Sequence, residues 1–296
     1  MDGILNIYKP PGMTSFDVVS IVRRELKIKK VGHTGTLDPM ASGVLVLCTG
    51  KATKISQYIL GSKKSYIGEL TLGYETDTQD LEGKVLKHSK KKVSSKDISE
   101  VFNSFKGELN QIPPMYSAVR FKGRKLYELA REGKVVERKS RKVTIYNLDI
   151  LEIDENNKVL FGVECSAGTY IRTLCNDIGY KLGTYGYMSY LTRTSVSNFK
   201  IEDSIGLNSI KGKNKDSIRS LILPIDKGLV NYPNIILEDK YYSKIVNGVM
   251  IPVENLNIDY NYNDILKVYS EENFLGLGKI IKRDGQELLK MIRVLV

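Results

Sequence analysis

Apolar and polar positions follow strand and helix periods in turn along the first 72 residues. Residues 4–8 predict a strand, because an apolar run there ends at a Pro-Pro-Gly turn. Apolar side chains then recur at helical spacing up to residue 26, behind a capping box formed by Thr14 and Asp17. An unbroken apolar run at residues 44–48 predicts a buried strand, and alternation over residues 66–72 predicts a half-buried one.

Shorter elements follow up to residue 105. Residues 53–60 predict a helix that stops at Gly61. Ser95 is expected to cap a second helix, with Ile98, Val101, Phe102 and Phe105 at helical spacing. The stretch at residues 75–83 is polar and acidic and contains Asp77 and Asp80. It lacks the spacing and the terminal glutamate of a calcium-binding EF-hand loop, so a solvated loop is expected.

Two alternating segments, residues 143–153 and 159–165, predict one hairpin with its turn at residues 154–157. Residues 166–168 are expected to lead into a helix that turns Ile171, Leu174, Ile178 and Leu182 inward. Strand material at residues 187–199 places Leu191 and Arg193 on one face. Arg172 lies in the first turn of that helix, where a cation opposes the helix dipole. A carboxylate partner near Arg172 is expected to offset this cost.

From about residue 231 the predicted elements become short and mostly β. A helix is predicted at residues 241–246, strands at 249–253, 265–269, 274–281 and 288–294, and a hairpin turn at Asp284 and Gly285. These elements predict a β-rich appendage of roughly 65 residues, a size within the range of domains.

The composition is that of a folded globular protein with a large unit and a smaller one. The chain has 296 residues, of which 42% are hydrophobic, enough for a sizeable core. Its apolar runs are shorter than the ~18 residues that span a membrane, and the N-terminus lacks the pattern of a signal peptide. Three cysteines without paired spacing and two histidines predict neither a disulfide framework nor a metal centre, as in a reducing cytoplasm.

The net charge of +11 is concentrated in one part of the chain. Residues 84–142 carry 17 Lys and Arg against 6 Asp and Glu, whereas the rest of the chain carries 28 of each sign. A concentrated basic surface predicts a polyanionic partner, most often nucleic acid. Aromatic rings suited to base stacking are interleaved with these cations at Tyr116, Phe121 and Tyr127. The alternatives are a merely solvated surface for residues 90–92 and a place inside a short helix for Tyr127.

A Gly-rich loop in front of the buried strand at residues 44–48 is the main candidate for a functional site. It contains His33 and several hydroxyl groups, and Asp38 is its only carboxylate. A loop that leads into a buried strand is a rigid mount for a polar group. Locally, Asp38 and the proline after it can equally start a turn, and a lone loop histidine is more often structural.

Five ordered motifs resemble the family of bacterial tRNA pseudouridine-55 synthases, the TruB type, over nearly the full chain. They are KPPGMTS at residues 9–15, GHTGTLDP at 32–39, residues 66–73 with TDT at 76–78, PPMYSA at 113–118 and GTYIR at 168–172. One departure is Ser197, where the family usually has glycine; it concerns the local backbone geometry.

The resemblance implies an α+β fold in which helices flank a mixed, mainly antiparallel sheet. It implies a catalytic domain over residues 1–230, with a basic tRNA-binding insertion at about 84–142, and a PUA-like RNA-binding domain over 231–296. It also implies a monomeric cytoplasmic enzyme that acts on the T-arm of tRNA without an obligatory protein partner. The reaction gains and loses no atoms overall, so no cofactor and no metal are expected.

The family's catalytic residues carry over onto matching positions of this chain. Asp38 corresponds to the aspartate that stabilises positive charge at C1′ of the target uridine, as glycosidase carboxylates do. Arg172 corresponds to the arginine that pairs with this aspartate and keeps it ionised. Tyr66 corresponds to the ring that stacks on the base, with its hydroxyl as a candidate for assisting proton transfer. The resemblance leaves open whether attack occurs at C1′, at C6 or through a glycal, and which group removes the carbon-bound proton.

Four further positions are implied to contact the flipped-out nucleotide or its surroundings. His33 corresponds to the residue that fills the space vacated by the nucleotide, and Tyr170 and Leu191 to residues that line the uracil pocket. Lys9 corresponds to a lysine that supports the active loop.

Other functions fit parts of the sequence. An RNA chaperone needs only the basic span and the C-terminal module, and has no need for Asp38, Tyr66 and Arg172 together. A guide-dependent relative of the dyskerin type lacks the basic insertion and relies on partner proteins. A deaminase is excluded because the zinc-ligand spacing is absent.

Overall fold

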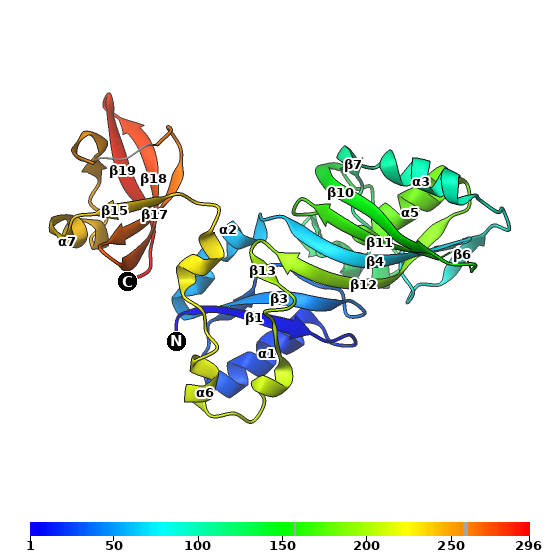
Figure 1. Cartoon of the computed structure of the whole chain (residues 1–296), viewed down its shortest axis with the longest axis horizontal. Helices are drawn as coiled ribbons and strands as arrows, with labels where there is room; N and C mark the ends of the chain where they lie inside the picture. The colour runs from blue at the N-terminus through cyan, green and yellow to red at the C-terminus, as the bar shows by residue number, and fades with distance from the viewer. Residues whose placement is uncertain (157, 257–259) are drawn as a thin grey trace.

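Ten strands form one large sheet through the middle of the molecule (Figure 1). The structure is a computed structural model that describes residues 1–156, 158–256 and 260–296. In order across the sheet the strands are β14 (Ile205–Gly206), β1 (Gly3–Lys9), β3 (Ser42–Thr49), β12 (Gly186–Val196), β4 (Lys64–Leu72), β11 (Lys158–Cys165), β10 (Arg141–Ile153) and β7 (Gly107–Gln111). Two shorter strands join its sides, β13 (Phe199–Lys200) on β12 and β2 (Val31–His33) on β3.

The sheet is mixed and mainly antiparallel, as predicted. Only the pairs β1–β14 and β3–β12 are parallel. The β3–β12 pairing is short, with Thr192 opposite Ser42 and Arg193 opposite Gly43, and it joins the two halves of the sheet as a seam. A Cβ at Gly43, where φ is +103°, would lie 2.2 Å from the Arg193 carbonyl oxygen, so this close approach requires glycine.

Helices cover the two halves of the sheet separately. α1 (Ser15–Leu26) begins at the predicted Thr14–Asp17 capping box and packs its apolar face on β1 and β3. α5 (Ile171–Leu182) and α3 (Ser95–Asn103) pack against β4, β10, β11 and β12. The helices thus cover two separate apolar clusters, one under α1 and one under α3 and α5.

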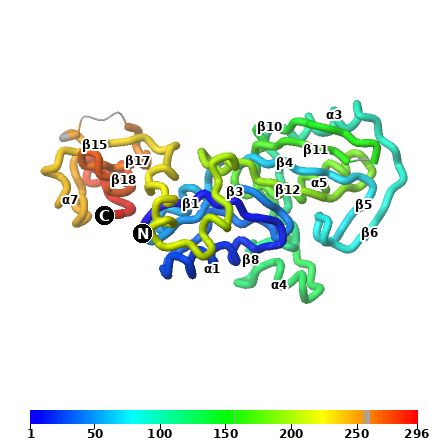
Figure 2. Tube along the Cα trace, turned by 60° about the horizontal axis from the view of Figure 1, so that its bottom comes forward, coloured from blue at the N-terminus to red at the C-terminus, as the bar shows by residue number. Residues whose placement is uncertain are grey.

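The basic span at residues 84–142 does not form one separate appendage. Its first part is built into the body, because α3 buries Ile98 and Phe102 and β7 pairs with β10. Residues 112–140, here called the basic lobe, form a smaller unit with its own apolar cluster. The lobe contains β8 (Arg120–Phe121), β9 (Arg124–Lys125) and α4 (Leu126–Arg131). Figure 2 shows α3 and α4 widely separated, on opposite sides of the sheet.

A second sheet of five strands forms the C-terminal part of the chain. Its order is β15 (Asn234–Leu237), β17 (Ile265–Ser270), β18 (Asn273–Arg283), β19 (Gln286–Val294) and β16 (Ile251–Pro252), with α7 (Tyr242–Val246) beside it. The predicted hairpin turn is confirmed, with φ of 52° at Asp284 and 83° at Gly285. This C-terminal module shares an apolar cluster with the body, since Leu277 and Leu295 are buried with Ile55 and Ile59.

The remaining elements are short. They are β5 (Tyr74–Thr76), β6 (Val85–His88), α2 (Ser56–Leu60), α6 (Lys215–Arg219) and the 3-10 helices η1 (Gly50–Ile55), η2 (Leu207–Ser209), η3 (Ile225–Leu229), η4 (Asp239–Tyr241) and η5 (Val253–Asn255). Within the described ranges, no helix has the length and apolar character that a membrane crossing requires.

Several expectations were wrong in detail. The capping residue of α3 is Ser94, not Ser95, because Ser94 and Asp97 exchange the reciprocal side-chain and backbone bonds. Residues 53–60 start as the 3-10 helix η1 and become α-helical only in α2. The solvated loop expected at residues 75–83 is instead the end of the β5–β6 hairpin, and it buries Asp80. The pattern also does not predict β2, β7 and β15, whose three to five residues give too few alternations.

Two further sequence predictions concern Ser197 and the hairpin at residues 143–165. Ser197 has a φ of 54°, so a serine here holds the left-handed conformation that glycine favours. The 143–165 hairpin is confirmed as β10 and β11, while Asn157 of its predicted turn lies outside the described residues.

We expect Leu277→Ala to lower the free energy of unfolding of the whole chain by about 2–5 kcal/mol, the usual cost of such a core truncation. Leu277 is fully buried and packs in the cluster that joins the C-terminal module to the body. Ile236→Ala is the matched control, because Ile236 in the same module is 70% exposed. Denaturant unfolding of both variants measures the effect, and equal losses would contradict a shared core.

Candidate active site

The loop that carries Asp38 lies at the seam between β3 and β12 and is held from one side by Arg193. The Arg193 side chain is almost fully buried and points across the seam. Its guanidinium donates to the carbonyl oxygens of Val44 (2.7 Å), Gly35 (3.1 Å) and Thr36 (3.3 Å). A buried cation thus fixes the backbone just before Asp38.

The KPPGMTS segment at residues 9–15 holds the other side of the same loop. Lys9 is fully buried, and its ammonium donates to three backbone carbonyls, including that of Pro39 at 3.1 Å. The Ser15 hydroxyl bonds both the N–H and the C=O of Leu37, at 2.8 and 3.1 Å. Burial lowers the pKa of Lys9 to about 8. The loop around Asp38 is therefore immobilised by backbone contacts on both sides.

Arg172 is placed between two carboxylates at the start of α5. Its Nε lies 3.0 Å from Asp38 Oδ2, at an angle that makes no hydrogen bond, while Nη2 donates to Asp38 Oδ1 at 3.2 Å. Nη1 donates to Asp80 Oδ2 at 3.1 Å. Backbone carbonyls of Thr78 (3.3 Å) and Tyr116 (2.9 Å) accept from the same guanidinium. The carboxylate partner expected for Arg172 is thus present twice.

The two carboxylates differ in their access to solvent. The Asp80 side chain is 6% exposed and has the neutral donors Thr78 Oγ1 and the Glu82 N–H beside Arg172. The Asp38 side chain keeps 33% of its surface accessible, so a substrate can reach it. Burial raises the pKa of Asp38 above its ordinary value of 3.8; the Arg172 guanidinium opposes that shift, and the Asp80 charge adds to it. Asp80 therefore acts as the structural counter-ion and Asp38 as the accessible one.

Tyr66 and Leu191 lie on neighbouring strands beside the loop. Tyr66 on β4 is opposite Arg193, and Leu191 on β12 is opposite Gly68. Both side chains belong to the apolar cluster that includes Leu37. Burial raises the pKa of Tyr66 to about 12, so its hydroxyl stays protonated at neutral pH. This phenol can donate a hydrogen bond but is a poor base.

His33 and Tyr170 occupy the ends of the elements that flank the site. His33 is the last residue of β2, and its Nδ1 accepts from the Gly35 N–H at 3.3 Å. Burial, and then the Arg193 charge, lower the His33 pKa, which keeps the ring neutral. Tyr170 is the residue before α5, and the Gln111 side-chain amide bonds its backbone on both sides. The Arg141 guanidinium lies 5.6 Å from the Tyr170 ring centroid.

The structure brings the predicted residues to one seam and adds three that the sequence reasoning missed as site residues. The loop from His33 to Asp38 meets Arg172 directly, with Lys9 beneath it and Tyr66 beside Arg193. The additions are Asp80, Arg193 and Gln111. Asp80 follows the TDT of the quoted motif, and Gln111 precedes the PPMYSA motif, so motif proximity was the available signal.

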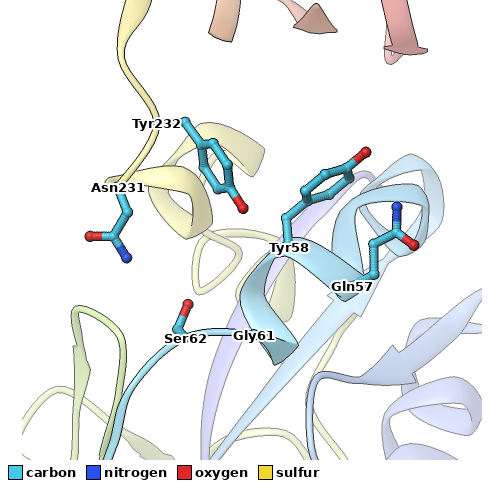
Figure 3. A pocket seen from close by; sticks show the side chains of 6 residues that line it. All are labelled: Gln57, Tyr58, Gly61, Ser62, Asn231 and Tyr232. Atoms are coloured by element: carbon cyan, nitrogen blue, oxygen red, sulfur yellow. The ribbon is translucent and has the colours of Figure 1, made fainter. Parts of the chain in front are cut away.

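A cavity of about 390 Å³ lies away from these residues, where the body meets the C-terminal module (Figure 3). Its walls come from α2 and the two residues after it, and from Asn231 and Tyr232 just before β15, with the Tyr58 and Tyr232 rings packed edge to face at 5.8 Å. No predicted site residue lines it. In the described part of the chain, no three His, Cys, Asp or Glu side chains gather in a way that would hold a metal ion.

Comparison with known sequences gives a consistent set of relatives. Residues 23–171 match the model for the N-terminal domain of TruB family pseudouridylate synthases, and residues 172–230 match that for the tRNA pseudouridylate synthase B C-terminal domain. The tRNA pseudouridine synthase B of Clostridium kluyveri is 52% identical over 297 residues and covers 100% of both chains. That of Alkaliphilus oremlandii is 48% identical, covering 100% of this chain and 99% of the relative.

Similar solved structures extend the likeness to the fold. A crystal structure of a Cbf5–Nop10–Gar1 complex matches with a TM-score of 0.78 at 28% identity, covering 99% of this chain and 85% of that one. An H/ACA RNP bound to a substrate RNA containing 2′-deoxyuridine matches with a TM-score of 0.76 at 27% identity and the same coverage. These matches include the C-terminal sheet and confirm the predicted α+β fold with a PUA-like C-terminal part.

We expect Asp38→Asn to raise the melting temperature at pH 7. A carboxyl whose folded pKa is raised contributes most to stability below its unfolded pKa, near 3.8, and loses that contribution as pH rises through the folded pKa. The neutral amide avoids this loss, so the difference from the wild type should shrink as the pH falls toward 3.8. Thermal unfolding over a pH series measures it, with the exposed Asp203→Asn as control. A lower melting temperature at pH 7 would show that the Arg172 pairing outweighs burial.

Proposed function

The chain belongs to the TruB family of pseudouridylate synthases, and from this membership we propose that it converts the T-loop uridine at position 55 of tRNA to pseudouridine. The observation that carries the proposal is the accessible Asp38 carboxylate paired with a buried arginine at the seam. The enzyme class is an isomerase, because pseudouridine has the same atoms as uridine.

The reaction breaks the bond from N1 of the base to C1′ of the ribose and forms a bond from C5 to C1′. The base turns between these two events, the C5 proton leaves, and N1 ends with a proton. We propose that Asp38 acts as the nucleophilic carboxylate that meets the positive charge developed during glycosidic cleavage. Its 33% exposed side chain lies on a loop held by Arg193 and Lys9, which keeps the carboxylate in place.

Arg172 and Asp80 prepare Asp38 for this role. The guanidinium opposes the effect of burial on the Asp38 pKa and so favours the ionised carboxylate. Asp80 balances the arginine from the opposite side, so that Arg172 is not an unpaired buried charge when Asp38 reacts.

The neighbouring rings suit a flipped-out base. Tyr66 stays protonated, which supports stacking and hydrogen-bond donation and argues against proton removal by its hydroxyl. A neutral His33 ring suits the space that the nucleotide vacates. Tyr170 and Leu191 complete the lining of the uracil pocket, and Lys9 acts through the loop because its ammonium is occupied by three carbonyls.

The positive charge that suits RNA binding lies in residues 84–142. Their net charge of +11 supports a tRNA grip by the basic lobe, whose residues 112–140 carry 8 Lys and Arg against 3 Asp and Glu. Residues 231–296 carry 8 Lys and Arg against 9 Asp and Glu, so the PUA-like module has no excess of positive charge for phosphates. We place the domain boundary near residue 230, between η3 and β15.

The enzyme is proposed to act as a monomer in the cytoplasm without a guide RNA. About 50% identity to proteins named tRNA pseudouridine synthase B supports this over the guide-dependent alternative. That alternative has its own support in the likeness to a Cbf5–Nop10–Gar1 complex, at only 28% identity. Activity of the purified chain on tRNA, with no added protein or RNA, distinguishes the two.

We expect the purified wild type to release tritium from C5-labelled uridine in unmodified tRNA, and Asp38→Asn to reduce that release at least ~10³-fold, as loss of a nucleophile does in other enzymes. Changing the T-loop uridine to cytidine should abolish release at that position. Folding of the variant is checked by its melting curve.

Two results would redirect the proposal. Tight tRNA binding by the wild type without release would favour an RNA chaperone. Equal tritium release by Asp38→Asn and the wild type would support the isomerase reaction but reject Asp38 as its nucleophile.

We expect a double change, Lys122→Ala with Lys139→Ala, to weaken tRNA binding and to reduce the slope of log K against log salt by about 2, one for each lost phosphate contact. Both lysines are exposed on the basic lobe. Lys290→Ala is the control, since Lys290 is exposed on the PUA-like module. Binding is measured by titration at several salt concentrations; an equal slope for the control and the double variant would contradict a grip by the lobe.

A further inference from the structure

We propose that Gln111 is a positioning residue that sets the start of α5 and thereby aims Arg172 at Asp38. The inference rests on the proposed function, because Arg172 is assigned its role there. Gln111 ends β7 and is 3% exposed.

The contact between Gln111 and Tyr170 uses both ends of the side-chain amide. Gln111 Oε1 accepts from the Tyr170 N–H at 2.7 Å, and Gln111 Nε2 donates to the Tyr170 C=O at 3.0 Å. The two residues are 59 positions apart in the chain, so this pair of bonds closes a long loop. Two bonds to one peptide position fix its orientation as well as its place.

The start of α5 needs such an external support. Tyr170 is the residue before the helix and makes no side-chain cap, and its C=O already accepts the Leu174 N–H at 3.0 Å. The preceding Gly168 has a φ of +86°, which gives the incoming chain no rigid direction of its own. Gln111 fixes the direction of the backbone at Tyr170, and Arg172 is two residues after Tyr170.

The same segment touches Arg172 a second time. Tyr116, five residues after Gln111, accepts from Arg172 Nη2 at 2.9 Å through its backbone carbonyl. Between these two contacts lie Pro113 and Pro114, whose fixed φ angles stiffen the connection. Residues 111–116 therefore form a brace that holds the backbone at Tyr170 and the guanidinium of Arg172 at a set distance.

The brace is also the entrance to the basic lobe. The lobe begins directly after Gln111, and its Arg138 donates to the Pro113 C=O at 3.1 Å. An RNA bound by the lobe therefore contacts the part of the chain that continues from residues 111–116, the segment that positions Arg172. We expect Gln111, at the start of this segment, to affect the rate of the chemical step more than the affinity for RNA.

The test compares Gln111→Met with Gln111→Glu. Methionine keeps the length and the burial and loses both hydrogen bonds, while glutamate keeps the Oε1 acceptor and loses the donor to Tyr170. Gln57→Met on α2 is the matched control, because Gln57 is an exposed glutamine outside this site. Single-turnover rates on pre-bound tRNA, tRNA affinity and melting temperature are measured for all four proteins.

We expect Gln111→Met to lower the single-turnover rate roughly 10–100-fold, the scale of a misplacement of about 1 Å, with tRNA affinity within twofold. The acid limb of its pH–rate profile should move to higher pH, because Arg172 is the group that most lowers the Asp38 pKa. Asp80, Lys9 and Arg193 also face Asp38 and are unchanged in the variant. Gln111→Glu should show a loss of the same kind, because its second carboxylate oxygen faces the Tyr170 C=O in place of the Nε2 donor.

A purely structural role predicts a different result. The single-turnover rate would then fall only in proportion to the folded fraction, and the acid limb of the pH–rate profile would not move. In a variant that folds, an unchanged rate per folded enzyme or an unmoved acid limb overturns the inference. If Gln111→Met does not fold, the same two readouts on Gln111→Glu decide. A wild type that forms no pseudouridine rejects the proposed function itself, whereas an active wild type with a fully active Gln111→Met rejects only the role of Gln111.

Discussion

The site depends on one buried cation that is shared between two carboxylates. Charges in a protein interior are costly unless they are paired, and the removal of one partner is more damaging than the absence of the pair. Arg172 is 5% exposed and meets Asp80 on one side and Asp38 on the other. Asp80 is a buried structural partner of Arg172. The Asp38 carboxylate can therefore contact a substrate while Arg172 keeps a charged partner.

This interaction also explains why distant parts of the chain converge. Asp38 comes from the loop before β3, Asp80 from the β5–β6 hairpin, and the Tyr116 carbonyl from the basic lobe. Each of these segments is irregular, so none is fixed by a sheet ladder alone. The guanidinium has five donors in a planar fork, and it can hold three such segments at once.

Much of this arrangement could be predicted from the sequence, and the part that could not is physically distinct. The Thr14 capping box and the alternation in β4 are local signals, and the structure confirms both. Asp38 and Arg172 stood in motifs. For Asp80 the sequence predicts a solvated residue, because an aspartate in a polar loop has the same local pattern whether it faces water or a buried arginine. The partner lies 92 residues away, and it comes near because the loop of the β5–β6 hairpin is bonded to β12, where Leu81 N–H donates to the Met188 C=O at 3.0 Å and Met188 N–H to the Gln79 C=O at 3.1 Å.

The positive charge of the chain is distributed unevenly between the 84–142 span and the C-terminal module. The excess of basic residues lies in the 84–142 span, while the PUA-like module has a net charge of −1 and joins the body through apolar side chains. A module fixed by a shared core cannot move freely to search for RNA, so it presents a rigid surface beside the catalytic body. The basic lobe, by contrast, has only a small cluster of its own around Leu126 and Leu129 and reaches the site through residues 111–116. The lobe therefore contacts Arg172 directly through the Tyr116 carbonyl, and the segment that leads into it holds the Tyr170 backbone through Gln111.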